Sequence, residues 1–230
     1  MIKVTENIAN IETQLAQSAI RAGRRPGTVR LLAVSKKQPL DKVLEAADAG
    51  QRDFGENFVQ EGLEKIRAAG RKDLVWHFIG HLQSNKTREV AESFDWVHSV
   101  DRRKIAQRLN DQRPAHLPPL NVCIQVNVDS EPAKSGARPE EVLDLARAIS
   151  GMPRLRFRGL MCLPAIRDGF AEQRKPFAAL RALAESLTEA GVTNDILSMG
   201  MSDDFEAAIA EGANIVRIGT AIFGSRDAAD

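Results

Sequence analysis

One lysine stands where an amine could do covalent chemistry. The segment LLAVSKKQPL, residues 31–40, reads as an apolar strand that ends in Lys36 and Lys37. Successive side chains of a strand point to opposite faces, so Lys36 shares the face of Val34 and Lys37 takes the other. A lysine at such a position can attack an aldehyde and form an imine, provided that part of it is deprotonated. The alternative is a solvated charge at a strand end, which we expect for Lys37.

Two pairs of a glycine and a hydroxyl residue could hold a phosphate group. Gly200 and Ser202 precede a helix predicted to begin near Asp203, and Gly219 and Thr220 follow the last apolar run. Glycine lets the backbone approach a ligand closely, and a helix start offers free N–H groups and a positive dipole end. Ser202 could instead be an ordinary N-cap. The two pairs together nevertheless indicate a phosphate site.

Arg217 interrupts the last apolar run, where apolar side chains are expected. Such a guanidinium is either half of a buried ion pair or a donor aimed into a site, where a ring nitrogen or an anion could accept its hydrogen bond.

Other polar residues follow the second, third and fifth apolar runs. Asn57 ends the second run, and His77 and His81 flank the third. The histidines have the four-residue spacing of a zinc pair, but the stretch lacks the glutamate of the HExxH pattern and reads as strand and loop, so we expect no metal. The loop Lys134-Ser135-Gly136 after the fifth run either covers the site or is an ordinary solvated turn.

Short apolar runs alternate with helical patterns along the chain. The runs cover residues 29–35, 52–56, 76–81, 96–100, 120–128, 155–163, 195–200 and 214–219. The helical patterns cover residues 41–49, 58–69, 85–92, 102–111, 139–149, 175–190 and 203–211. An amphipathic helix precedes the first run, with its apolar face at Val4, Ile8, Ile11, Leu15 and Ala19.

Most of these runs are continuously apolar, as strands are when both of their faces are buried. Eight such strands with intervening helices predict an α/β fold, a single (β/α)8 TIM barrel with an extra N-terminal helix, in one domain covering residues 1–230. A doubly wound sheet would carry a glycine-rich fingerprint after its first strand, and that fingerprint is missing. In a barrel, Lys36 and the phosphate pairs all fall at the C-terminal ends of strands, where active sites lie.

The composition is that of a globular protein, with 43% hydrophobic and 27% charged residues and a formal net charge of +1. Without a long basic run, nucleic acid is not an expected partner. No stretch reads as a signal peptide or a membrane span, so we expect no membrane partner and a cytoplasmic location. Cys123 and Cys162 lie inside apolar runs and are expected to be reduced core residues.

Seven segments together resemble the pyridoxal phosphate homeostasis protein family, whose members are similar to the barrel of bacterial alanine racemase. The segments are LLAVSK, FGENFVQE, WHFIGHLQSNK, KSG, GLMCLP, SMGMSDDFEAAI and VRIGTAIFG, spread over residues 31–224. The resemblance implies that the cofactor is pyridoxal 5'-phosphate (PLP), held as an imine by Lys36. It also implies that Arg217 faces the pyridine nitrogen, that Asn57 lies near the cofactor, and that the phosphate is bound by Ser202, Gly219 and Thr220. We assign Gly200 and Met201, in the same loop as Ser202, to the cofactor site as well.

Three functions fit a lysine beside a phosphate site. The resemblance implies a non-catalytic carrier that holds PLP and hands it over. We expect a monomer or a weak dimer, with PLP-dependent apoenzymes as recipients. An amino acid racemase of the same barrel type is the alternative, but it uses a tyrosine opposite the lysine, and the sequence contains none. An arginine at the ring nitrogen also disfavours protonation of that nitrogen and weakens the ring as an electron sink. A Schiff-base aldolase acting on a phosphorylated sugar would need no partner for a ring.

Overall fold

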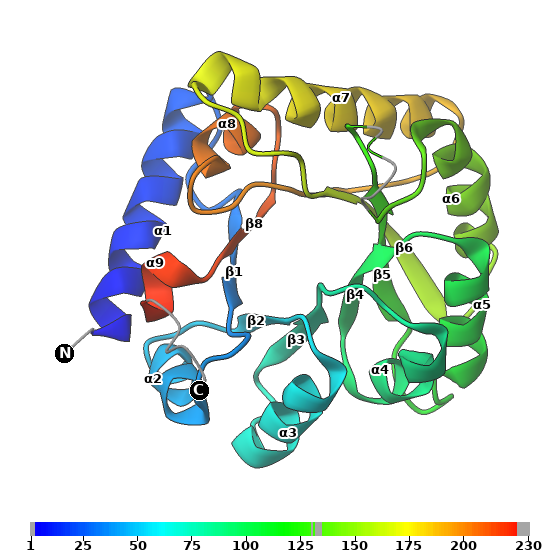
Figure 1. The fold of residues 1–230 in the computed structure, drawn as a ribbon, viewed down its shortest axis with the longest axis horizontal. Coiled ribbons are helices and arrows are strands. Elements are labelled where there is room, and N and C mark those ends of the chain that lie inside the picture. The colour runs from blue at the N-terminus through cyan, green and yellow to red at the C-terminus, as the bar shows by residue number, and fades with distance from the viewer. Residues whose placement is uncertain (1–2, 130, 132–134, 225–230) are drawn as a thin grey trace.

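The computed structural model describes residues 3–129, 131 and 135–224, and they form a closed barrel of parallel strands surrounded by helices (Figure 1). Each strand pairs with the next along the chain, and the last pairs with the first. The strands are β1 (Arg30–Val34), β2 (Asp53–Glu56), β3 (Val75–Phe78), β4 (Trp96–Val100), β5 (Leu120–Val126), β6 (Leu155–Cys162), β7 (Ile196–Ser198) and β8 (Ile215–Ile218). Each lies within one of the apolar runs or extends one residue beyond it, and the predicted TIM barrel is confirmed.

The helices cover the outside of the barrel, as Figure 1 shows. They are α1 (Val4–Arg21), α2 (Leu40–Asp48), α3 (Val59–Ala69), α4 (Thr87–Ser93), α5 (Arg103–Gln112), α6 (Val142–Ser150), α7 (Phe170–Glu189), α8 (Phe205–Ala210) and α9 (Thr220–Phe223). Two short 3-10 helices, η1 (Ser84–Lys86) and η2 (Pro139–Glu141), lead into α4 and α6.

The extra N-terminal helix α1 is confirmed. Its apolar face is buried as predicted and packs against α2, α8 and α9. The side-chain amide of Asn7 donates a hydrogen bond of 2.8 Å to the carbonyl of Ile222, which joins α1 to α9. The helix therefore covers the outside of the region where the first and last strands meet.

The barrel has two apolar cores because neighbouring strand residues face opposite ways. In β1, Leu31 and Ala33 belong to the larger core between the strands and the helices. Leu32 and Val34 belong to a smaller core inside the barrel. This smaller core consists of Leu32, Val34, Ile79, Trp96, Cys123, Met161, Ile196 and Ile215. Two buried faces per strand explain why the strand sequences are continuously apolar.

Two elements differ from the sequence-based expectation. Helix α7 begins at Phe170 rather than at Lys175, and it contains Pro176. Proline is usually confined to the first turn of a helix because it has no N–H to donate, but here it lies beyond the first turn. The four-residue helix α9 was not predicted, because its short apolar sequence has no helical period to recognise.

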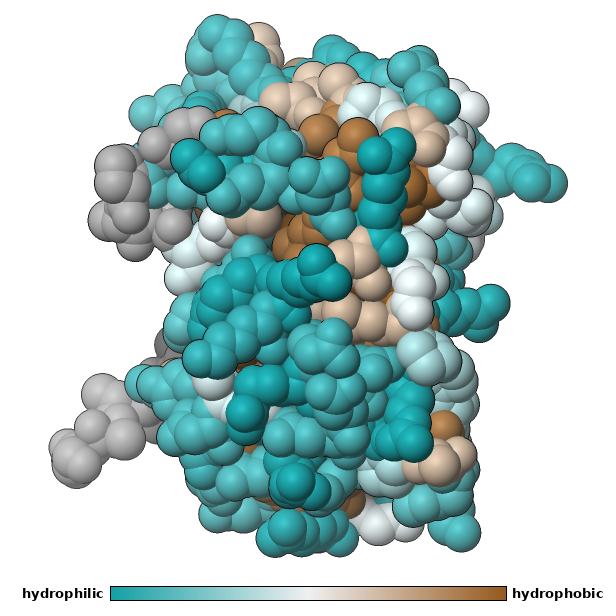
Figure 2. Space-filling model, turned by 90° about the vertical axis from the view of Figure 1, so that its right-hand side faces the viewer, coloured by the Kyte–Doolittle hydropathy of each residue, from teal (hydrophilic) through white to brown (hydrophobic). Residues whose placement is uncertain are grey.

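The side of the molecule that carries α5 and α6 is covered mainly by hydrophilic residues, with hydrophobic residues gathered near its centre (Figure 2). None of the helices in the described ranges is both long enough and apolar enough to cross a membrane.

Candidate functional site

A cavity of about 560 Å³ lies at the C-terminal ends of the strands. It brings together all the residues that the sequence assigned to the cofactor except Gly200. Those lining residues are Lys36, Asn57, Met201, Ser202, Arg217, Gly219 and Thr220. Val34, Ile79, Leu163, Asp203 and Ala221 complete the lining. Residues that are distant in the sequence therefore meet at one end of the barrel.

Lys36 follows β1 by two residues and lines the same cavity as Val34, as the strand parity indicated. In the turn between β1 and α2, the two neighbouring lysines differ in exposure. Lys36 is partly buried, whereas Lys37 is exposed and adopts a left-handed backbone conformation with φ of 57°. That conformation is uncommon outside glycine and marks a constrained turn.

A buried cluster holds the residue before Lys36. The hydroxyl of Ser35 donates a 2.6 Å hydrogen bond to the Glu56 carboxylate, and Lys65 Nζ donates a 2.6 Å bond to the Ser35 carbonyl. Lys65 also lies 2.9 Å from Glu56 in an ion pair that is almost fully buried. Burial raises the pKa of Glu56, while the nearby Lys65 charge opposes that rise. Ser35 is thus fixed through both its backbone and its side chain.

The residue after Lys36 is held by the same cluster. The backbone N–H of Lys37 donates a hydrogen bond to Glu61, and Glu61 lies 2.7 Å from Lys65 Nζ. Lys36 therefore stands between two anchored neighbours, so its backbone cannot move freely relative to the barrel. The signal for Lys65 in the sequence is weak, since an isolated lysine on a helix normally lies in solvent.

The loops after β7 and β8 place two hydroxyl residues on the cavity wall. Neither Ser202 nor Thr220 uses its hydroxyl for a hydrogen bond with another residue of the described part of the chain. Gly219 passes close to β1, since a Cβ on it would lie 3.1 Å from the Val34 carbonyl oxygen. These two loops thus present hydroxyl groups to the cavity where the sequence predicted a phosphate.

Gly200 has a packing role rather than a place on the wall. Its φ is 93°, and a Cβ on it would lie 2.7 Å from the Cβ of Ala208. Its carbonyl accepts a 3.0 Å hydrogen bond from the N–H of Arg217. Gly200 therefore lets α8 approach the β7 loop and ties that loop to β8.

Arg217 is 4% exposed and lines the cavity from β8. Its Nη1 donates hydrogen bonds of 2.6 and 2.9 Å to the carbonyl and the hydroxyl of Ser198, and its Nη2 donates one of 2.8 Å to the Cys162 carbonyl. No carboxylate of the residues described here lies within ion-pair distance of it. Burial lowers the pKa of Arg217, but a guanidinium stays protonated in proteins. Among the described residues, the cation is held by neutral oxygen atoms rather than by an ion pair.

Asn57 supplies a polar atom that still needs a partner. Its Oδ1 is buried and has no hydrogen-bond partner among the described residues, although the side chain lines the cavity. A buried polar atom without a partner is costly and points to a ligand or water that completes it. Gly80 permits this position, because a Cβ there would overlap the carbonyl oxygen of Asn57.

The two histidines of the third strand region do not act as a pair. His77 lies inside the barrel and is fully buried, whereas His81 is exposed, with Nδ1 3.4 Å from the hydroxyl of Ser135. No group of three potential metal ligands occurs in the described ranges. Lys134, in the predicted polar loop, lies outside the described residues. Sequence reasoning missed His98 and Ser198, which contact His77 and Arg217, although both are polar residues inside apolar runs.

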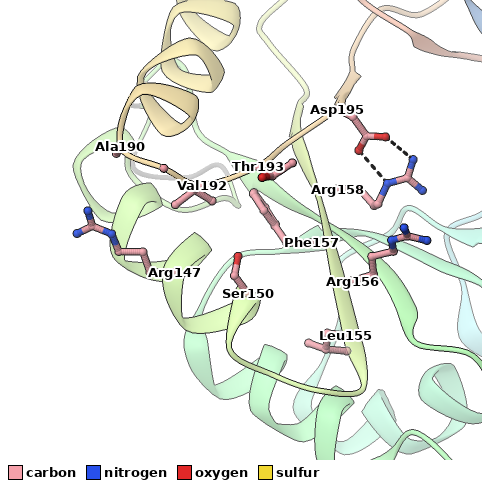
Figure 3. Close-up of a pocket in the computed structure, with 11 residues that line it drawn as sticks. Arg147, Ser150, Leu155, Arg156, Phe157, Arg158, Ala190, Val192, Thr193 and Asp195 are labelled. Carbon is pink, nitrogen blue, oxygen red and sulfur yellow. Dashed lines mark hydrogen bonds and ion pairs between the residues drawn. The ribbon is translucent and has the colours of Figure 1, made fainter.

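A second cavity, of about 740 Å³, lies at the opposite end of the barrel, where β6 and β7 begin (Figure 3). Arg158, one of the arginines that line it, is turned toward Asp195 and bonded to it at 2.6 and 2.8 Å. Figure 3 shows Arg147 and Arg156 on opposite sides of the cavity, with Phe157 between them. None of its described lining residues is a lysine, histidine or cysteine, so it offers no nucleophile comparable to Lys36.

Comparison with known proteins identifies close relatives of the whole chain. The family model described as the N-terminal domain of alanine racemase matches residues 7–227. The chain is 56% identical to the pyridoxal phosphate homeostasis protein of Pseudomonas aeruginosa, covering 99% of this chain and 97% of that protein. It is 52% identical to the Escherichia coli protein of the same name, covering 99% and 98%.

Solved structures show the same fold. PipY of Synechococcus elongatus is 38% identical and covers 96% of this chain and 100% of its own. The TM-score is 0.86 for the PipY structure without PLP and 0.84 for the structure with PLP bound. The alanine racemase of Corynebacterium glutamicum, at 17% identity and a TM-score of 0.73, shares the barrel over 62% of its length.

Proposed function

Because the chain belongs to the pyridoxal phosphate homeostasis protein family, we propose that it binds PLP in the cavity at the C-terminal ends of the strands. The observation that carries the proposal is the meeting of an amine, two unengaged hydroxyls and a buried guanidinium around one cavity of suitable chemistry. When bound, PLP supplies an aldehyde that condenses with amines and a ring that withdraws electrons.

The residues present fit this cofactor at three points. Lys36 lines the cavity, and its amine would hold the cofactor by condensing with the aldehyde, with loss of one water. Ser202, Gly219 and Thr220 offer hydroxyl and backbone donors to a phosphate. Arg217 makes three hydrogen bonds and a guanidinium has five N–H groups, so it would have donors left for the ring nitrogen. The unpartnered Asn57 Oδ1 supports a ligand in the same place.

The anchored turn around Lys36 gives the carrier its rigidity. Ser35 and Lys37 are fixed on either side by Glu56, Glu61 and Lys65. A lysine on an anchored turn and hydroxyl groups on the facing loops would bind the two ends of one small molecule with little loss of conformational freedom on binding.

We propose that the protein holds and supplies PLP without catalysing amino acid chemistry. Racemisation needs an acid and a base on opposite faces of the reacting carbon. Among the described residues that line the cavity, the ionisable ones are Lys36, Asp203 and Arg217. Asp203 follows Ser202 directly, and the sequence contains no tyrosine, so we assign no second acid or base opposite Lys36 to these described lining residues.

The recipients of the cofactor would be PLP-dependent apoenzymes, and the carrier would act as a monomer or a weak dimer in the cytoplasm. Two free cysteines in the buried core support a reducing compartment.

Trapping of the covalent bond tests the proposal. Purified protein is incubated with PLP, reduced with borohydride and mapped by peptide mass spectrometry. We expect the adduct on Lys36 and its loss in Lys36→Ala. Lys37→Ala is the matched control and should keep the adduct, because Lys37 is exposed and lies outside the cavity lining. An adduct on Lys37, or on no lysine at all, would refute the assignment.

A further inference from the structure

A continuous line of polar side chains crosses the inside of the barrel. His77 Nε2 lies 2.8 Å from the Asp53 carboxylate, and His77 Nδ1 lies 2.9 Å from His98 Nε2. His98 Nδ1 lies 2.9 Å from the hydroxyl of Ser198, which in turn accepts a 2.9 Å hydrogen bond from Arg217. Five residues from β2, β3, β4, β7 and β8 thus connect the first residue of β2 with the cavity. We call Asp53, His77, His98 and Ser198 the polar chain.

The polar chain is isolated from solvent along most of its length. His77, His98 and Ser198 are fully buried, and only the Asp53 end is partly exposed, at 16% of its side chain. Asp53 also pairs with Arg30 at 3.3 Å on the outside. His77 stacks on Trp96, with the ring centroids 5.3 Å apart. Apolar residues of the inner core fill the remaining interior. Polar groups buried in this way must satisfy one another.

The hydrogen bonds of the polar chain can run in only one donor-to-acceptor direction when Asp53 is ionised and both histidine rings are neutral. Burial alone would raise the pKa of Asp53, but the His77 hydrogen bond and the Arg30 charge lower it below the ordinary value. Burial lowers the pKa of His77, although Asp53 opposes this, and burial holds the pKa of His98 well below its ordinary value. Both rings are therefore neutral at pH 7.

The direction then follows from geometry. An ionised carboxylate accepts, so His77 donates from Nε2 and accepts at Nδ1. His98 must therefore donate from Nε2 and accept at Nδ1, and the hydroxyl of Ser198 donates to it. The hydroxyl oxygen remains free to accept from Arg217, as its 2.9 Å bond requires. Every hydrogen bond points from Arg217 toward Asp53.

We propose that the polar chain positions Arg217 for the ring nitrogen of the cofactor. It does so by fixing the orientation of the Arg217 guanidinium and by linking it through aligned hydrogen bonds to the negative charge of Asp53 across the barrel. A buried cation needs compensation, and Arg217 has no carboxylate within ion-pair distance in the described ranges. Hydrogen bonds aligned in one direction polarise one another, which carries part of the Asp53 charge inward. His98 and Ser198 are positioning residues, because in this role they act only through Arg217.

This inference rests on the proposed function for its ligand, but its first test does not use the cofactor. Protein labelled with ¹⁵N in histidine is studied without PLP by long-range ¹H–¹⁵N NMR at pH 7. The protein has four histidines, of which His81 and His116 are exposed and exchange their ring protons with water. We expect His77 and His98 both to be neutral with the proton on Nε2. A proton on Nδ1 of either ring would overturn the proposal.

The second test asks whether the polar chain affects PLP binding through the ring nitrogen. Ser198→Ala should weaken PLP binding about tenfold, because one hydrogen bond to a charged group is lost. An analogue of PLP with C–H in place of the ring nitrogen should bind wild type and Ser198→Ala equally well. Ser99→Ala is the matched control, since Ser99 is also buried but its hydroxyl has no partner among the described residues.

The outcomes separate the two proposals. Equal weakening of PLP and the analogue, or an equal effect of Ser99→Ala and Ser198→Ala, would overturn the positioning role while PLP binding stands. If wild-type protein binds no PLP, the proposed function fails as well as the positioning role, whatever the tautomers are. Nε2 tautomers together with a nitrogen-dependent effect of Ser198→Ala would support the proposal.

Discussion

The buried neutral histidines should make stability depend on pH in a way that one substitution can isolate. In the unfolded chain, a histidine binds a proton as the pH falls below about 6.5. In the folded protein, burial keeps the pKa of His98 well below that value. The unfolded state therefore binds more protons, so acidification favours unfolding. The stabilising contribution of the neutral His98 is complete above the pKa that histidine has in the unfolded chain. It is lost as the pH falls toward the pKa of His98 in the folded protein.

The magnitude follows from the proton uptake of the unfolded state. A histidine that stays neutral in the folded state costs about 1.3 kcal/mol of stability between pH 7.0 and 5.5. His77 adds a similar amount to the extent that its pKa is lowered by burial. Glu56 and Asp204 act in the opposite direction, because burial raises the pKa of both. Comparing wild type with a variant that keeps Glu56 and Asp204 cancels the contribution of these carboxyls to the pH dependence.

His98→Gln is the variant for that comparison. Urea unfolding, followed by the fluorescence of the buried Trp76 and Trp96, gives the free energy of unfolding at both pH values. The loss on acidification should be about 1.3 kcal/mol smaller in His98→Gln than in wild type, whatever the absolute stability of the variant. His116→Gln, at an exposed position, should behave like wild type. Equal losses in wild type and His98→Gln would refute a neutral, buried His98.

Three further predictions concern the site and the barrel. Ser202→Ala and Thr220→Val should each weaken PLP retention about ten- to a hundredfold in equilibrium binding, and pyridoxal without the phosphate should bind wild type much more weakly; equal binding of the two vitamers would contradict the phosphate site. Gly159→Ala should lower the free energy of unfolding by about 3 kcal/mol, because its φ is 150° and a Cβ would overlap the Ile196 carbonyl, whereas Gly169→Ala, with open space around it, should cost about 1 kcal/mol in the same urea titration. The PLP-loaded protein should exchange the Cα proton of L-alanine in deuterated water at less than about 1 s⁻¹, the low end for ordinary enzymes, and faster turnover would favour a racemase.

The barrel could be predicted because its physical cause is local. Each strand is short and apolar on both faces, and the helices between the strands have their own period, so the order of elements is visible along the chain. The position of Lys36 was predictable for the same reason, since the parity of one strand relates it to Val34. The prediction of a phosphate site after the last two strands came from the general architecture of such barrels.

The polar chain could not be predicted from the same signals. Periodicity indicates which face a residue takes, but it does not say which polar residue on another strand it meets. Asp53 and Ser198 are 145 positions apart and are joined only through two histidines of other strands. Arg217 drew attention because it is charged, whereas His98 and Ser198 are small or neutral and resemble tolerated core residues. The buried contact of Lys65 with Ser35 was hidden similarly, since it depends on how α3 lies against β1 and β2.

The two cysteines of the barrel give the site a chemical protection of its own. Cys123 and Cys162 are buried, and burial raises the pKa of each thiol to about 12. At pH 7 such thiols are almost wholly protonated, and the thiolate is the form that attacks carbonyl groups and reacts with peroxide. The backbone carbonyl of Cys162 accepts a hydrogen bond from the Arg217 guanidinium. An aldehyde held in this cavity therefore meets no competing sulfur nucleophile from these two residues, and oxidants that inactivate enzymes with reactive thiols should leave this interior unchanged.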